Sequence, residues 1–146
     1  LKNVINFTNK IKNFDPYISI LSATEEVLPQ MESSVEAKKI MEWALKEIDS
    51  NLKILGPLAF DNSISIHAAK MKNINNPVAG NANILLVPNI ETGNSLVKML
   101  VNFMEATAGG FITGSAIPVV ITSRSDNIES RLSSISNAVL SIQWLI

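Results

Sequence analysis

Pro118-Val-Val-Ile-Thr-Ser-Arg-Ser-Asp126 is an apolar run that changes abruptly into hydroxyl, guanidinium and carboxylate side chains. Its β-branched residues predict a short buried strand, and a helical pattern follows the polar residues. Open α/β sheets bind their ligands at the carboxyl ends of the strands. The stretch therefore predicts an α/β fold with Ser123, Arg124 and Asp126 at a ligand site.

Strand and helix patterns alternate along the rest of the chain. We expect strands at residues 17–22, 52–57, 83–87, 109–114 and 117–121, and helices at residues 33–48, 61–71, 91–106 and 125–142. This alternation predicts a three-layer α/β sandwich with a mostly parallel sheet. The Asn, Pro and Gly residues of 73–81 predict a surface loop or hinge.

Composition narrows the class of function. The chain has 146 residues, which suits one domain, and 47% of them are hydrophobic, which suits a packed core. Its 12 basic and 13 acidic residues are scattered, so no electrostatic footprint for nucleic acid is visible. The absence of cysteine and the single histidine argue against a metal site.

The sequence also predicts where in the cell the protein works and whether the chain is part of a longer protein. The apolar stretches are too short to cross a bilayer, and no signal-peptide pattern opens the chain, so we expect a cytoplasmic protein without a membrane partner. The chain begins with Leu1, and residues 1–12 have the pattern of the last turns of a helix. We therefore expect a piece of a longer protein.

Three segments, taken together and in this order, resemble the phosphate acetyl/butyryltransferase family. They are Gly56-Pro-Leu-Ala-Phe-Asp-Asn62, the segment from Pro77 through Ile84-Leu-Leu-Val-Pro-Asn-Ile-Glu-Thr-Gly-Asn94, and Pro118 to Asp126 with Glu129-Ser130 beyond. The Thr122-Ser-Arg form is more similar to the butyryltransferase branch than to the acetyltransferase branch.

The resemblance implies the C-terminal half of a two-lobed enzyme with an isocitrate/isopropylmalate dehydrogenase-like lobe. Residues 1–114 would form the second lobe, and residues 115–146 would return toward the first. Such enzymes move an acyl group between coenzyme A and inorganic phosphate, here butyryl, with acyl-CoA and phosphate as substrates, no separate cofactor, and a homodimeric assembly. The alternatives are a phosphate acetyltransferase, or a non-catalytic binding or oligomerisation lobe.

The resemblance also implies roles for the polar residues of 118–126. Arg124 would bind phosphate, because a guanidinium offers two parallel donors; its alternative is a surface ion pair with Asp126 or Glu129. Ser123 would donate a hydrogen bond to the thioester oxygen, or else bond only to its own backbone. Asp126 would accept a proton, and its alternative is to cap the following helix.

Two further pairs of residues are candidates for substrate binding. Gly93 and Asn94 lie between a predicted strand and helix, where free backbone amides can bind phosphate, although an ordinary turn explains them as well. Asp61 and Asn62 match the family pattern and equally match a helix cap. The chain departs from the family at Asn89, which replaces an Asp, and at Thr92, which replaces an Ala.

Overall fold

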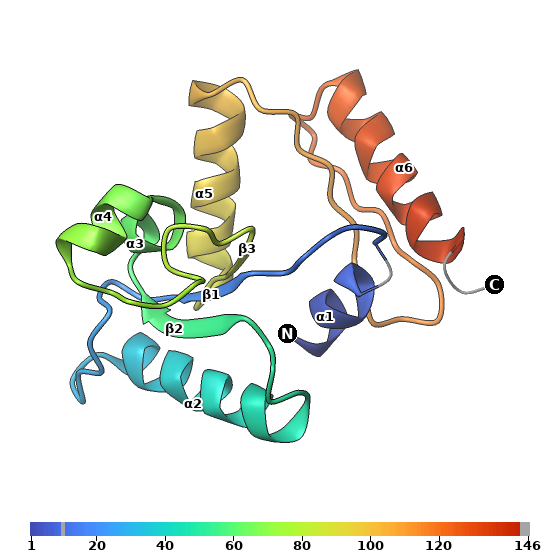
Figure 1. The fold of residues 1–146 in the computed structure, drawn as a ribbon. Helices are drawn as coiled ribbons and strands as arrows, with labels where there is room; N and C mark the ends of the chain where they lie inside the picture. The colour runs from blue at the N-terminus through green and yellow to red at the C-terminus, as the bar shows by residue number, and fades with distance from the viewer. Residues whose placement is uncertain (10, 144–146) are drawn as a thin grey trace. The chain divides into compact units, whose positions relative to one another are not determined.

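The computed structural model describes residues 1–9 and 11–143. Residues 144–146, the end of the predicted returning segment, lie outside the described residues. The chain divides into two compact units: unit 2 is residues 15–92, and unit 1 is residues 1–14 together with residues 93–146. In chain order the elements are α1 (Lys2–Thr8), β1 (Ile18–Leu21), α2 (Glu32–Glu47), β2 (Ile54–Leu58), α3 (Phe60–Ile64), α4 (Ile66–Met71), β3 (Ile84–Leu86), α5 (Ile90–Phe103) and α6 (Ile128–Gln143) (Figure 1).

Unit 2 is built on a three-stranded parallel sheet in the order β2-β1-β3. The central strand β1 pairs through Ile18 with Ile54 on one side and with Ile84 on the other. All four residues of β1 are buried, as expected of a strand covered on both faces. The predicted α/β class is confirmed, and so are the first three predicted strands, to within two residues at each end.

Helices cover the sheet of unit 2. α2 packs on β1 and β2, and α3 contacts β1; Figure 1 shows α2 on one side of the strands and α3 with α4 on the other. The helix expected over residues 61–71 is two short helices, because the backbone at Ser65 is extended and its hydroxyl accepts the Ala68 N–H to start α4. Asp61 lies inside α3, so the prediction that it caps a helix is wrong.

Residues 78–80 pack against α3 at the end of the loop 73–81, while Asn73, Asn75, Pro77 and Asn81 are exposed. Val78 is 1% exposed, and the Gly80 N–H donates to the Asn62 carbonyl at 2.7 Å. Below this loop the Ser19 and Ser63 hydroxyls lie 2.6 Å apart, and both residues are completely buried. The segment is therefore a surface loop, as predicted, and residues 78–80 at its end are buried without loss of hydrogen bonds because the Gly80 N–H finds a partner in α3.

In unit 1 the two predicted strands at 109–114 and 117–121 are absent. They are reduced to one antiparallel bridge between Ile112 and Val119, next to Pro118, which has no N–H to donate. Ile121 is 72% exposed. The prediction of a buried strand at the start of residues 118–126 is therefore wrong, since this segment has no neighbouring strand to complete its backbone hydrogen bonds.

Helix α6 forms as predicted, but the face that is buried is the one that carries small side chains. The buried residues are Ser130, Ser134 and Ala138, and the Ser134 hydroxyl accepts the Gly110 N–H at 3.0 Å. A Cβ on Gly109 would lie 2.3 Å from the Ser133 hydroxyl oxygen, so glycine at position 109 allows this close approach. The helical spacing of Ile128, Leu132, Ile135, Val139 and Ile142 predicts an apolar stripe for the core, but this stripe is exposed.

Gly80 provides a test of the packed loop. Its φ is +81°, and a Cβ there would lie 2.5 Å from the Ile66 Cα. We expect Gly80→Ala to lower the free energy of unfolding by about 2 kcal/mol or more, from left-handed strain and overpacking together. Urea unfolding measures the change, with Gly110→Ala as the control because a Cβ at Gly110 meets nothing within 4 Å. Equal losses in the two variants would contradict the packing described here.

Candidate active site

Residues 123–126 form a tight turn before α6 that is closed by Asp126. The Asp126 Oδ2 accepts the Ser123 N–H at 2.7 Å, and the Ser123 carbonyl accepts the Asp126 N–H at 3.2 Å. Charge-assisted hydrogen bonds of this kind are among the stronger ones in proteins. The carboxylate therefore holds the backbone of Ser123 in place.

Capping of α6 falls to the next residue. The Asn127 Oδ1 accepts the Ser130 N–H at 2.8 Å, which is the geometry of an N-cap. The alternative prediction that Asp126 caps this helix is therefore wrong. Since Oδ2 is its only bonded oxygen within the described residues, the Asp126 Oδ1 is free to meet another donor.

The Arg124 guanidinium is exposed and unneutralised. Among residues 1–9 and 11–143 it forms no ion pair, neither with Asp126 nor with Glu129, so that alternative is not realised. Among the described residues its side chain makes no hydrogen bond, and its carbonyl accepts from Arg131 Nη2 at 3.5 Å. A planar guanidinium without a carboxylate partner can bind an incoming phosphate through two donors.

Two residues that the sequence reasoning missed contact the Ser123 hydroxyl. Its Oγ lies 3.0 Å from the Ser125 Oγ, and the Lys98 Nζ from α5 approaches the Ser125 Oγ at 3.2 Å and the Ser123 Oγ at 3.5 Å. Lys98 is the only charged residue between Thr92 and Met104. A single charge within the otherwise uncharged run of residues 92–104 was the signal that could have identified it.

Gly93 and Asn94 lie within the first turns of α5, and not in a loop before it. The helix begins at Ile90, and the Asn89 Oδ1 accepts both the Thr92 N–H at 2.9 Å and the Thr92 hydroxyl at 2.7 Å. One of the amides that could have met a phosphate is thus already paired. Asn89 and Thr92, the two departures from the family pattern, form this cap together.

Asp61 and Asn62 belong to unit 2, whereas Gly93, Asn94, Ser123, Arg124 and Asp126 belong to unit 1. Asp61 is exposed, and Asn62 is fully buried with its Nδ2 donating to Glu25 Oε2 at 3.0 Å. Lys72 also binds this oxygen, at 2.9 Å, which lowers the pKa of Glu25 and raises that of Lys72. The Asn62 Oδ1 is buried and has no hydrogen-bond partner in the part of the chain that the structure describes.

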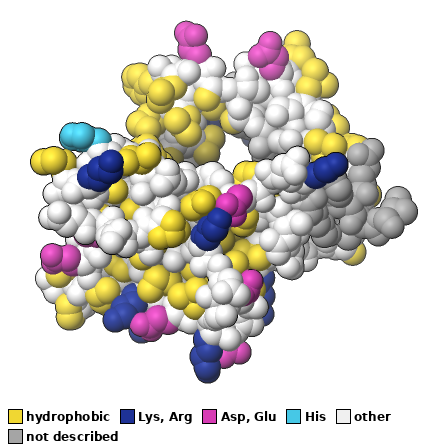
Figure 2. Space-filling view, in the orientation of Figure 1, with side chains coloured by type: hydrophobic (Ala, Val, Ile, Leu, Met, Phe, Trp, Pro, Cys, Tyr) yellow, Lys and Arg dark blue, Asp and Glu magenta, His cyan; other side chains and the backbone are white. Residues whose placement is uncertain are grey.

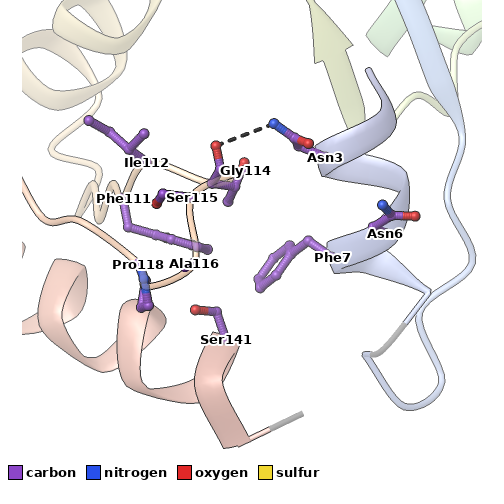
Figure 3. Close-up of a pocket in the computed structure, with 11 residues that line it drawn as sticks. Asn3, Asn6, Phe7, Phe111, Ile112, Gly114, Ser115, Ala116, Pro118 and Ser141 are labelled. Atoms are coloured by element: carbon purple, nitrogen blue, oxygen red, sulfur yellow. Dashed lines mark hydrogen bonds between the residues drawn. The ribbon is translucent and has the colours of Figure 1, made fainter. Parts of the chain in front are cut away.

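A separate pocket of about 270 Å³ lies within unit 1, between α1, residues 111–118 and α6 (Figure 3). The rings of Phe7 and Phe111 meet edge to face, with centroids 5.2 Å apart, and the Asn3 Nδ2 donates to the Thr113 carbonyl at 3.3 Å. The wall combines apolar and uncharged polar groups. None of the site residues predicted from sequence lines it.

The described residues hold neither a cluster of metal ligands nor a membrane-spanning helix. No three His, Asp or Glu side chains within residues 1–9 and 11–143 are arranged as metal ligands. Nor does any helix in these ranges have the length and apolar character needed to cross a bilayer.

The chain is similar to known acyltransferases along nearly its whole length. It is 41% identical to the phosphate acetyltransferase of Rhizobium meliloti, over 96% of this chain and 44% of that protein. It is 40% identical to the probable phosphate butyryltransferase of Bacillus subtilis (strain 168), over 95% of this chain and 46% of that protein. The chain thus spans about half the length of the curated relatives it matches.

A solved structure shows the same likeness. The crystal structure of a branched-chain phosphotransacylase from Enterococcus faecalis V583 matches with a TM-score of 0.83 and 37% identity, covering 97% of this chain and 50% of that one. The family model described as phosphate acetyl/butaryl transferase matches residues 2–139. The resemblance inferred from the sequence is confirmed: the chain belongs to the phosphate acetyl/butaryl transferase family.

Proposed function

We propose that this chain supplies half of the active site of an acyltransferase that moves an acyl group between coenzyme A and inorganic phosphate. The observation that carries the proposal is that Arg124, with an exposed and unneutralised guanidinium, follows Ser123 on a turn fixed by Asp126. Membership of the family supports the same reaction. The reaction has to join two anions and stabilise charge on a thioester oxygen, and these residues suit both tasks.

The reaction follows from the roles of these groups. A phosphate oxygen held by Arg124 attacks the thioester carbonyl carbon, forming a C–O bond while the carbonyl electron pair moves onto oxygen. The Ser123 hydroxyl donates a hydrogen bond to this oxyanion and keeps its proton. When the carbonyl reforms, the C–S bond breaks, and coenzyme A leaves as a thiolate that takes up a proton, so the products are an acyl phosphate and free thiol.

Asp126 would act as the proton acceptor in the reverse direction. Its Oδ2 is held by the Ser123 N–H, which leaves Oδ1 to take the proton from the thiol of coenzyme A before that sulfur attacks the acyl phosphate. A carboxylate with one oxygen fixed keeps its orientation without losing its capacity to accept. The same residue would thus hold Ser123 and serve as the base.

Completion of the site by a second half is part of the proposal. The chain spans half of the solved relative, and the apolar residues of α5 and α6 are exposed, including Phe103 at 86% and Ile128 at 77%. Figure 2 shows apolar side chains at the surface over α5. Contiguous exposed apolar surface of this kind indicates an interaction surface.

The finer details of the proposal are its specificity, location and assembly. We assign a preference for butyryl, supported by the Thr122-Ser123-Arg124 form, with acetyl as the alternative, since relatives of both specificities match equally well. The enzyme would work as a cytoplasmic homodimer and would use no cofactor beyond its two substrates. Light scattering of a chimera in which this chain replaces its aligned segment in the Enterococcus faecalis relative measures the assembly. A mass of one chain, in place of two, would show that the dimer is wrong.

Phosphate-dependent release of thiol tests the function. We define the completed enzyme as a chimera in which this chain replaces its aligned segment in the Enterococcus faecalis relative. We expect the completed enzyme to release thiol from butyryl-CoA only when phosphate is present, and this chain alone to release none, because half of the site is missing. Acetyl-CoA, tested in parallel, reports the preference. A folded completed enzyme that releases no thiol from either substrate would favour a non-catalytic lobe and reject the function.

Substitutions of Arg124 and of Ser123 should change different kinetic constants of the completed enzyme. Arg124→Lys keeps the charge but loses the two-donor geometry, so we expect the KM for phosphate to rise by about tenfold or more. Ser123→Ala removes one oxyanion donor, which should lower kcat by roughly 10²–10³-fold. Steady-state kinetics with both substrates varied separates the two effects. Arg131→Lys, at the only other arginine of the chain, is the control; if its KM for phosphate changes as much as that of Arg124→Lys, the assignment of Arg124 is wrong.

A further inference from the structure

Lys98 lies against the Ser123 turn without a counter-ion of its own. It is half-buried on α5, with its Nζ 3.2 Å from the Ser125 Oγ and 3.5 Å from the Ser123 Oγ. Among the described residues no carboxylate pairs with it. Its positive charge is therefore directed at two hydroxyl groups, one of which belongs to the residue assigned to the oxyanion.

The donors and acceptors of this cluster favour one direction of hydrogen bonding. An ammonium group has three donors and no acceptor, so a serine oxygen that bonds to Lys98 must accept from it. The Ser125 Oγ is the nearer of the two, and it lies 3.0 Å from the Ser123 Oγ. When the Ser125 Oγ accepts from Lys98, its own hydrogen is free to donate to the Ser123 Oγ.

This direction leaves the Ser123 hydrogen unused inside the protein. The Ser123 Oγ accepts from the Ser125 hydroxyl, and the Ser125 N–H approaches the same oxygen at 3.4 Å. These two contacts are shorter than the 3.5 Å approach of the Lys98 Nζ and use the two lone pairs of the oxygen, so the hydroxyl hydrogen of Ser123 is left to point outward. Hydrogen bonds in a chain polarise one another, and a cation at the start of the chain makes the last hydroxyl a better donor.

Resting on the proposed function, we propose that Lys98 is a positioning residue for the acyl transfer. Through Ser125 it orients the Ser123 hydroxyl so that this hydroxyl donates to the thioester oxygen. Asp126 fixes the backbone of Ser123, and Lys98 fixes the direction of its side chain. Lys98 does not hold the phosphate in this arrangement, since that role belongs to Arg124.

The kinetic test uses Lys98→Met in the completed enzyme. We expect kcat to fall on the order of tenfold, less than for loss of the oxyanion donor itself, with both KM values within about twofold because ground-state binding is retained. Lys98→Arg should recover most of the lost kcat, since it restores a cationic donor. Lys39→Met, which removes an exposed lysine of α2, is the matched control and should leave both constants unchanged.

We call the path from Lys98 through Ser125 to the Ser123 hydroxyl the relay. A double-mutant cycle distinguishes this relay from a general effect of losing the Lys98 charge. If Lys98 acts through Ser125 and Ser123, then Lys98→Met should change kcat by less than about twofold when Ser125→Ala or Ser123→Ala is already present. A full additive loss in either background would overturn the proposal. So would a rise in the KM for phosphate at unchanged kcat, which would instead make Lys98 a phosphate-binding residue.

A measurement on this chain alone tests the geometry without activity. The ¹⁵N resonance of the Lys98 ammonium should shift in Ser125→Ala, whereas that of Lys39 should stay in place. No shift at Lys98 overturns the contact on which the relay depends. If the completed enzyme releases no thiol while this shift is present, the proposed function fails for a reason separate from the cluster. An active completed enzyme whose kcat is insensitive to Lys98→Met rejects the relay and leaves the function standing.

Discussion

The burial of β1 on both faces is the constraint on which unit 2 depends. A strand with neighbours on each side and helices above and below has no exposed direction, so each of its side chains must find a partner in the interior. The polar member, Ser19, finds one in the Ser63 hydroxyl, 2.6 Å away. That contact fixes α3 on the sheet, and the carbonyl of Asn62 in α3 then accepts the Gly80 N–H. One buried hydroxyl pair thereby links the sheet, a helix and a loop, where an unpaired hydroxyl would destabilise the fold by roughly 1–3 kcal/mol.

The sequence predicts β1 well and the start of residues 118–126 poorly, although both are short β-branched runs. Local pattern reports that a segment suits a strand, but a strand also needs a neighbour to complete its hydrogen bonds. Ile18 has neighbours on both sides; Val119 has only one bridge to a glycine-rich segment. α6 shows the same limit: the pattern located the helix, yet Ser130 and Ser134 are packed in place of the apolar stripe. Which face of a helix is buried depends on the segments that pack against it, and the periodicity of the helix itself does not report these segments.

In the candidate site, too, the sequence identifies residues that are neighbours along the chain but misses a residue that the fold brings in from far away. Ser123, Arg124 and Asp126 could be named from the motif, because they are adjacent in sequence. The competition between Asp126 and Asn127 for the cap of α6 could not be settled there, since both have side chains suited to it. Lys98 is 25 residues from Ser123 and enters only through the fold. Its place as the one charge between Thr92 and Met104 marks it as unusual without saying which group it meets.

The departures at Asn89 and Thr92 concern the stability of α5 more than its chemistry. An Asp at position 89 would offer the same acceptor oxygen to the Thr92 N–H, and would add a charge that favours a helix N-terminus by about 0.3–1 kcal/mol. Asn keeps the acceptor and gives up that charge. Thr92 adds a second bond to the same Oδ1 through its hydroxyl, which an Ala cannot make and which is typically worth about 0.5–1.5 kcal/mol. The two changes offset each other at the helix start, and the helix that carries Lys98 toward Ser123 keeps its cap.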